Sequence, residues 1–566
     1  MEQAYKVEPE PDSGRWHLFV VLALCAMHGS LALQAYEPYS FLHGDGAFYA
    51  TINRSLLDGT LDQRPYQPVS WYERALGWNH TMDPGWSNVS LGRDGTWYPK
   101  HPILLPILTT PLFWLLGYPG LLLFNVACVV VALWIAFALA RRVAQPAAAA
   151  VTVLAFAAMP LFTRGAYAYS NDVLYGVLAI WAVERFVAGR FAWSGLLFGL
   201  AIWAKATCGL LAAPFGLWLL LTRQWRPALQ MATAAALPVT VHLGLNAVMF
   251  GHPLTTSYHR ILVMQDGKQA LFDIQARFGR PWRTGLLSLW HDSDQGLWPT
   301  APLTVAGALG LPWLARALPA VALALVLSIV GYALFYARFE YTYARFFTPW
   351  AALLAVPAAL ALDRLANAAI RVVPPLFRRL GRLRTVVLGL VLVLAIGIGA
   401  VLARRPEHAW SAAQSLTQAR VIRGDGEQGI PCDYFNPRLQ KWECAQLEPE
   451  NWHRWGHAVG DQCRFPGYGA KGWLWLHPNP THAKRITWTQ VPAGTLTLRF
   501  GLAPPSHFGG VQFRLLSGGK VLRELRVDAI GTPKTVALPV TAGNLAIEVP
   551  VQAFDWRQLC VAASID

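Results

Sequence analysis

Two carboxylates in this 566-residue chain stand where apolar runs meet polar sequence, and both are candidate catalytic residues. Asp45 lies between Gly44 and Gly46, a few residues beyond the apolar run 16–36. Glycines let the backbone turn sharply and let a substrate approach closely. Asp172, in "YSNDVLYG", stands where another apolar run begins. A carboxylate in a partly desolvated cleft can take a proton from a hydroxyl group. Capping of a helix N-terminus is the alternative role for both residues, because Asp is a favoured cap.

Several cations occupy similar positions at the ends of apolar runs. Lys100 and His101 lie in "YPKHP", and Lys205 lies inside the apolar stretch "GLAIWAKATCG". A lysine within an apolar run is costly to bury and indicates a function, with snorkelling to the interface as the alternative. Arg338 and Arg345 stand among tyrosines in "YARFEYTYARFF". Arginine suits a phosphate group through bidentate contacts, and anchoring at a membrane interface is the alternative.

Long apolar segments must position these residues. Apolar residues make up 54% of the chain and charged residues only 14%, which excludes an ordinary cytosolic enzyme and indicates a membrane protein. The clearest membrane-crossing runs are 120–140 and 385–403, and neither contains a charge. The first apolar run follows a tail that is not basic, so it predicts a retained span rather than a signal peptide. We predict a polytopic α-helical membrane bundle of about 11 spans.

Arginines orient this bundle. The connection 361–384 is predicted to be cytoplasmic because cytoplasmic loops carry an excess of Lys and Arg. It contains Arg364, Arg371, Arg378, Arg379, Arg382 and Arg384. Counting spans from it places the N-terminus inside and the C-terminus outside the cytoplasmic (inner) membrane. The net charge of +15 is therefore carried by span ends, and no nucleic-acid partner is predicted.

Three regions follow from this pattern. Residues 1–15 form a cytoplasmic tail, and 16–403 form the membrane domain, with long external loops at about 37–100 and 251–298. Residues 404–566 form a soluble domain. Within it, "TLTLRFGLA", "VQFRLLSGGKVLRELRV", "KTVALPV" and "LAIEVPV" alternate apolar and polar residues, and "SGGK" is typical of a hairpin. Short, regularly spaced strands predict an all-β sandwich.

Four cysteines follow the last predicted span: Cys432, Cys444, Cys463 and Cys560. An even number in a soluble segment indicates disulfides and so places this domain in the periplasm or outside the cell. Four cysteines allow three pairings. We favour Cys432 with Cys444, which are close in sequence, and Cys463 with Cys560, which flank the strand-rich region.

Three tryptophans of the soluble domain are candidates for sugar binding. Trp473, Trp475 and Trp488 lie in or near its predicted strands. Both a sugar-stacking surface and packing in the core stay open for these three rings.

Several of these motifs together resemble the GT-C glycosyltransferases. The resemblance lies in "HGDGAFYATINRSLLDG", "DGTWYPKHPILLPILTTPLFWLLG", "YSNDVLYGVLAIWAVERF", "GLAIWAKATCGLLAAPFGLWLLL", "DQGLWPTAPLTVAGALGL" and "YARFFTPWAAL", and covers most of residues 16–365. The most similar branch contains the protein O-mannosyltransferases and the lipid A aminoarabinose transferases (families 39 and 83). The resemblance implies a polyprenyl-phosphate sugar donor, an active site outside the cytoplasm and an aspartate base in the first external loop.

The resemblance also implies roles for particular residues. Asp45 is the expected base, and Asp172 is expected to bind the acceptor or orient the first external helix. Lys100 matches a phosphate-contacting lysine of the family. Since the leaving group is a lipid phosphate, cations at the outer face are required, and we predict donor-phosphate binding by Lys100, His101, Lys205 and Arg345.

Two further motifs are assigned no ligand. Asp292 and Asp294 beside His291 form a weak metal motif, because hard-cation sites need about six oxygen ligands. The resembling branch generally uses no metal, so neither a metal nor another cofactor is predicted. Sequons at Asn53, Asn79 and Asn88 are short enough to arise by chance, and no glycan is assigned.

We therefore predict an inverting glycosyltransferase that moves a sugar from a polyprenyl-phosphate donor to an extracytoplasmic glycan, lipid or protein acceptor, with membrane lipids around it. A transporter or flippase of lipid-linked sugars is one alternative, which broken helices and a buried lysine would suit. A non-catalytic sugar-binding membrane component is another. Only the enzyme would release free polyprenyl phosphate from donor and acceptor.

Overall fold

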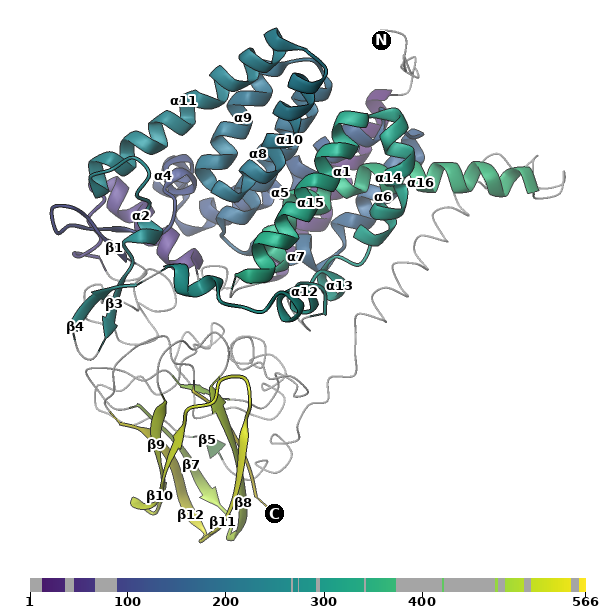
Figure 1. Ribbon diagram of the computed structural model, residues 1–566. Coiled ribbons are helices and arrows are strands. Elements are labelled where there is room, and N and C mark those ends of the chain that lie inside the picture. Colours follow the sequence, from purple (N-terminus) through teal and green to yellow (C-terminus); the bar gives the residue numbers. More distant parts are fainter. Residues whose placement is uncertain are drawn as a thin grey trace.

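A computed structural model describes most of the helical part of the chain and much of the β part. The described residues are 13–35, 45–66, 89–265, 268–272, 274–291, 296–339, 343–372, 420–421, 474–476, 484–502, 510–550 and 559–565. The predicted span 385–403 lies outside them. Figure 1 shows the helices gathered in one body and the later strands in another.

The helices follow one another from α1 to α16 along the first two thirds of the chain. Their bounds are α1 Ser13–Ala35, α2 Asp45–Leu57, α4 Leu104–Leu116, α5 Tyr118–Ala140, α6 Pro146–Ala157, α7 Pro160–Tyr167, α8 Asn171–Val187, α9 Phe191–Ala204, α10 Gly209–Leu221, α11 Trp225–Phe250, α12 Trp282–His291, α13 Leu297–Thr300, α14 Thr304–Ala317, α15 Pro319–Arg338 and α16 Thr348–Val372. Short 3₁₀ helices lie at η2 Ala206–Cys208, η3 Ser257–His259, η4 Ile274–Phe278 and η5 Ala344–Phe347.

Among the described residues, four helical segments are long and apolar enough to cross a membrane: Tyr118–Ala140, Trp225–Phe250, Pro319–Arg338 and Ala344–Ala368. Shorter apolar helices lie between them. The predicted α-helical membrane bundle is thus confirmed, whereas the number of about 11 spans stays a prediction. Spans are difficult to count from this sequence because single polar residues and prolines divide its apolar runs. Lys205 interrupts the run 191–221, and prolines begin α6 and α7.

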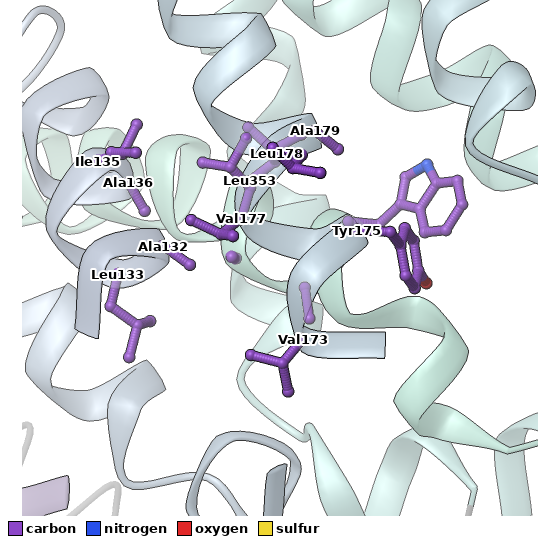
Figure 2. Packing of buried hydrophobic residues seen from close by; sticks show 14 of the residues in the cluster. Ala132, Leu133, Ile135, Ala136, Val173, Tyr175, Val177, Leu178, Ala179 and Leu353 are labelled. Carbon is purple, nitrogen blue, oxygen red and sulfur yellow. The ribbon is translucent and has the colours of Figure 1, made fainter. Parts of the chain in front are cut away.

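The core that carries the later site residues lies between α5, α8 and α16. Ala132 and Ala136 of α5, Val173 and Val177 of α8, and Leu353 of α16 belong to one buried cluster, shown in Figure 2. Small alanine side chains let the helix backbones approach closely. The start of α8 is therefore held by apolar packing against both neighbours.

Two glycines of α9 permit an unusually close contact with α11. A Cβ atom added at Gly195 would lie 2.0 Å from the backbone oxygen of Met231, and one at Gly199 would lie 2.4 Å from that of Ala235. These distances leave no room for a methyl group against an unyielding backbone. The two helices thus depend on glycine at both positions.

The two long loops that sequence analysis delimits are joined to each other. The hairpin β1 (Val89–Leu91) and β2 (Trp97–Pro99) belongs to the first, and the hairpin β3 (Leu262–Gln265) and β4 (Lys268–Leu271) belongs to the second. A β-bridge links Ser90 to Ile261. The Leu91 amide donates to the Arg260 carbonyl (2.8 Å), and the Ser90 hydroxyl donates to the Ser257 carbonyl (2.8 Å).

The C-terminal part consists of antiparallel strands in two sheets. The strands are β5 Arg420–Val421, β6 Leu474–Leu476, β7 Lys484–Val491, β8 Gly494–Leu502, β9 Val511–Ser517, β10 Lys520–Val527, β11 Lys534–Val540, β12 Gly543–Val549 and β13 Leu559–Ile565. One sheet has the order β10-β9-β12-β7-β5 and the other β11-β8-β13-β6. A single buried cluster draws residues from both sheets, and the Phe500 ring of β8 lies 5.0 Å from the Phe513 ring of β9.

The predicted strands of this part are confirmed, including the hairpin, whose Gly518 and Gly519 both have positive φ. The complete sandwich and the domain boundary at 404 stay predictions. Cys560 is buried in β13, but Cys432, Cys444 and Cys463 lie outside the described residues, so the disulfide pairing stays a prediction. Trp473 and the side chains of Trp475 and Trp488 also lie outside the described part.

We expect Gly195→Ala to lower the thermal unfolding temperature, because overpacking of a tight contact typically costs about 1–3 kcal/mol. The matched control is Gly216→Ala in α10, where an added Cβ meets nothing within 4 Å. There, the better helix propensity of alanine should leave stability unchanged or raise it by up to about 1 kcal/mol. Thermal unfolding of both purified variants in the same detergent is the measurement. Equal shifts in the two variants would contradict the close contact.

Candidate active site

The site residues predicted in the helical part lie in one charged cluster, although their segments are far apart in sequence. They are Asp45 at the start of α2, Lys100 and His101 after β2, Asp172 in the first turn of α8, Lys205 directly after α9, and Arg345 in η5. The cluster collects cations and carboxylates at the ends of helices. The cluster brings together residues that were named separately from the sequence, and the role of each stays a prediction.

Arg345 joins the two carboxylates. One of its terminal nitrogens lies 2.9 Å from Asp45 Oδ2, and its Nε lies 3.2 Å from Asp172 Oδ2. We call these three residues the Arg345 bridge. The Arg345 carbonyl accepts a hydrogen bond from the Thr348 hydroxyl (2.6 Å), which ties η5 to the first turn of α16.

Asp172 holds a second cation. Lys205 Nζ lies 2.5 Å from Asp172 Oδ1 and 3.5 Å from the centre of the Phe346 ring. Helix α9 ends at this point because Lys205 has an extended backbone, and the Asn171 side-chain amide donates to the carbonyl of Ala204. The break therefore directs a lysine from an apolar run at the carboxylate.

Helix capping does not account for the Asp172 side chain. Ser170 is the N-cap of α8, and its hydroxyl accepts from the Asp172 amide (3.1 Å). The Asp172 carboxylate is directed at Lys205 and Arg345 instead. Asp45 is the first residue of α2, and its carboxylate likewise faces cations.

His101 lies on the other side of Asp45. Its Nε2 is 3.7 Å from Asp45 Oδ1, too far for a hydrogen bond, and this buried atom has no hydrogen-bond partner among the described residues. The Tyr49 ring packs 5.1 Å from the imidazole. Burial lowers the pKa of His101 to about 4, so the ring is neutral at pH 7. The Oδ1 atom of Asp45 thus faces a neutral ring.

Lys100 is buried beside this group, and its carbonyl accepts from the Ser257 hydroxyl (2.6 Å) of the second long loop. Burial, with a smaller contribution from Arg277, lowers the pKa of Lys100 to about 7. Arg277 is not among the residues predicted from the sequence. Its side chain is buried with the guanidinium 4.6 Å from the Phe272 ring. No local pattern marks Arg277, because only the joining of the two loops places it near Lys100.

The electrostatics of the cluster keep Asp45 ionised. Burial alone would raise the pKa of the Asp45 carboxyl, but the neighbouring positive charges, above all that of Arg345, hold it well below its ordinary value. The carboxylate therefore bears its charge throughout the physiological pH range.

A buried polar network fixes the position of α2. The Asn53 side-chain amide donates to the Pro106 carbonyl and the Thr109 hydroxyl, both at 3.0 Å. Its Oδ1 accepts from the Tyr169 hydroxyl (2.8 Å), and Tyr169 also contacts the Thr109 hydroxyl (2.7 Å). Sequence analysis noted Asn53 only as part of a sequon. In the structure it connects α2, and so Asp45, to α4 and to the segment before α8.

Arg338, the other arginine considered in the sequence, lies outside the cluster. Arg338 Nε donates to the Phe278 carbonyl (3.1 Å) and its guanidinium lies 5.8 Å from the Trp282 ring, so it anchors the segment before α12. Asp292 and Asp294 lie outside the described residues. Within the residues that the structure describes, no group of three or more His, Cys, Asp or Glu side chains could hold a metal ion.

The fold and this cluster define a helical membrane protein with a carboxylate surrounded by cations at helix ends. The model of glycosyltransferase family 87 matches residues 98–337, a range that contains Lys100, Asp172 and Lys205. This match confirms the resemblance to the GT-C membrane glycosyltransferases seen in the sequence. The matching model is that of family 87, a family that the motif comparison did not name. Curated protein sequences include no match to the chain.

Solved structures of GT-C enzymes are similar at low sequence identity. They include the oligosaccharyltransferase AglB from Archaeoglobus fulgidus (13% identity, TM-score 0.45), covering 70% of this chain and 56% of AglB. ArnT from Cupriavidus metallidurans shares 15% identity (TM-score 0.41), covering 69% of this chain and 72% of ArnT. Arabinosyltransferase EmbB from Mycobacterium smegmatis shares 10% identity (TM-score 0.37), covering all of this chain and 66% of EmbB. The chain thus spans little more than half the length of AglB.

We expect Tyr169→Phe to destabilise the protein, because it leaves the buried oxygen of Asn53 without its donor. Such a loss typically costs about 1–3 kcal/mol. Tyr66→Phe is the control, since its hydroxyl donates to the exposed carboxylate of Asp58 (2.7 Å), which water can solvate afterwards. Thermal unfolding of both variants tests the difference. A loss at Tyr66 equal to or larger than that at Tyr169 would be inconsistent with the role given to the Asn53 network.

Proposed function

We propose that this protein is an inverting glycosyltransferase of the cytoplasmic membrane that moves one sugar from a polyprenyl-phosphate donor to an acceptor outside the cytoplasm. The observation that carries the proposal is the Asp45 carboxylate with cations from separate segments around it. Sugar transfer from a lipid phosphate needs both features, a base for the acceptor hydroxyl and positive charge for the departing phosphate.

In the proposed reaction the acceptor hydroxyl attacks the anomeric carbon from the face opposite the phosphate. Asp45 Oδ1, which makes no close contact with His101, receives the hydroxyl proton. The bond between the anomeric carbon and the phosphate oxygen breaks, and its electrons remain on the phosphate. A single displacement of this kind inverts the configuration at the anomeric carbon.

The cations serve the leaving phosphate in this proposal. Lys100, Lys205 and Arg345 would contact the donor phosphate, and Arg277 joins them as a candidate because it adjoins Lys100. Charge-assisted hydrogen bonds to a phosphate are worth roughly 1.5–3 kcal/mol each. His101 is neutral and would act as a hydrogen-bond donor rather than as a charge.

Asp172 is proposed as a positioning residue. Its carboxylate is nearly buried and contacts both Lys205 and Arg345. It would orient both cations toward the phosphate. Acceptor binding, the other role that the family resemblance implies, would need an approach past these two side chains.

The donor class is proposed from the chemistry of the site and its place in a membrane bundle. AglB was solved with a dolichol-phosphate and ArnT with undecaprenyl phosphate, which belong to the same chemical class. The sugar and the acceptor are left at the level of class. The C-terminal β part, proposed to be a periplasmic sandwich with two disulfides, would assist acceptor recognition, because the donor phosphate stays at the membrane.

A flippase would need the same cations but no base. The discriminating measurement is therefore chemical: purified protein in nanodiscs, given polyprenyl-phosphate sugars and an envelope-glycan extract, should release free polyprenyl phosphate in an acceptor-dependent manner. Movement of intact donor across the bilayer without such release would favour the transporter.

We expect Asp45→Asn to reduce transfer by roughly a hundredfold to ten-thousandfold, the usual contribution of a general base. The amide keeps the shape and can still accept from Arg345, so thermal stability should change little and donor affinity should not fall. Asp62→Asn is the control, because Asp62 is only partly buried and pairs with the exposed Arg64 on the same long loop. Turnover of the Asp45 variant within a few-fold of wild type would refute the assignment.

We expect donor affinity to fall as the pH rises from about 7 to 9. The pKa of Lys100 is about 7 in the free protein, and an anionic phosphate favours the ammonium form. Above that pKa, binding requires uptake of a proton, which costs at most about tenfold in affinity per pH unit. Lys100→Arg should bind with little pH dependence, because a guanidinium stays charged. An equally steep fall in the arginine variant would remove Lys100 from the phosphate site.

A further inference from the structure

The Arg345 bridge places the same cation on the proposed base and beside the proposed phosphate site. We propose that the donor phosphate draws the Arg345 guanidinium away from Asp45, so that the base is released only once the donor is bound. This inference rests on the function proposed above and concerns the order of events at the same site.

The two carboxylates of the Arg345 bridge differ in how many cations they contact closely. Asp172 keeps Lys205 at 2.5 Å when Arg345 leaves, so its charge remains compensated. Asp45 has Arg345 as its close ionic contact at 2.9 Å, while His101 stands off at 3.7 Å. Departure of the guanidinium therefore changes the environment of Asp45 far more than that of Asp172.

The bridge also lies at the accessible edge of the cluster. The side chains of Arg345 and Asp45 are 41% and 35% exposed, whereas that of Asp172 is 9% exposed. The Arg345 guanidinium lies 4.9 Å from the Tyr343 ring and 5.6 Å from the Phe346 ring. A guanidinium can redirect its N–H groups while it stays stacked on aromatic faces. An incoming phosphate can thus reach Arg345 without displacing the buried residues.

The charges of the reaction favour the same movement. Proton transfer from the acceptor hydroxyl neutralises the Asp45 carboxylate. Cleavage of the bond to the anomeric carbon leaves one additional negative charge on the phosphate. Arg345 consequently loses its attraction to Asp45 at the moment when its attraction to the phosphate grows. One side chain would hold the base before the donor arrives and stabilise the leaving group afterwards.

Asp45 should titrate differently in the two states. The titratable groups that face it from the surrounding elements are Tyr49, Lys100, His101, Lys205, Tyr258 and Arg345, with Asp172 across the bridge. Among the cations, Arg345 contributes most to the low pKa of Asp45. Transfer of Arg345 to a phosphate removes this contribution and should therefore raise the pKa of Asp45. The other cations remain in place, so the rise should be toward the ordinary range.

Infrared difference spectroscopy can follow this titration without turnover. The protonated-carboxyl signal of Asp45 is isolated by subtracting the spectrum of Asp45→Asn, in nanodiscs with and without a synthetic polyprenyl monophosphate. We expect the phosphate to move the Asp45 titration upward by roughly one to three pH units, the usual size of an effect from one adjacent charge. In Arg345→Gln, we expect the titration to be high already without the lipid and to change little when it is added.

Arg64→Gln serves as the matched control, since Arg64 makes an exposed ion pair with Asp62 on the same loop, and it should behave as wild type. Binding of the lipid with no upward shift in wild type would overturn the release of Asp45 and leave the proposed donor class intact. Absence of lipid binding would overturn the donor class and this inference together. An Arg345→Gln protein that titrates like wild type would show that Arg345 does not control Asp45. The wild-type measurement can still overturn the release even if that variant does not fold.

Discussion

The Asp172 carboxylate carries one charge, is nearly buried, and contacts both Lys205 and Arg345. Charges with so little access to water must be paired, because an uncompensated buried charge costs several kcal/mol. This requirement brings the start of α8, the break after α9 and η5 to one place. Asp45 joins the same network through Arg345, so the position of α2 depends on it as well.

Apolar packing makes that network possible. Val173 and Val177 follow Asp172 on α8 and pack in the cluster that includes Leu353 of α16. Helix α8, which carries Asp172, therefore shares one core with α16, which directly follows Arg345 in η5. Directional polar contacts then adjust the ends of the elements. Ser170 begins α8, Asn171 holds the end of α9, and Asn53 holds α2. The site is thus located by apolar packing and its geometry is set by hydrogen bonds.

Residues with a local anomaly could be found from the sequence. Asp45 stands between glycines, Lys205 interrupts an apolar run, and the alternating strands of the C-terminal part show their period directly. Arg277 and Asn53 show no such anomaly, because an arginine in a polar loop and an asparagine in an amphipathic helix are common. Their roles depend on which distant segment lies beside them. The same limit applies to the span count, the sheet order and the pairing of the Asp45 and Asp172 carboxylates through Arg345, which are all properties of tertiary structure.

The β-bridge between Ser90 and Ile261 and the hydrogen bonds around it join two loops that are separated by most of the helical bundle in sequence. In a recombinant that received only the first loop from a related protein, a foreign segment would have to pair with the Ser257 and Arg260 carbonyls of the second loop. It would also change the support that Ser257 gives to Lys100. The two loops should therefore be inherited together as related proteins diverge. Any attempt to graft a new specificity onto this scaffold would have to transplant them as a pair.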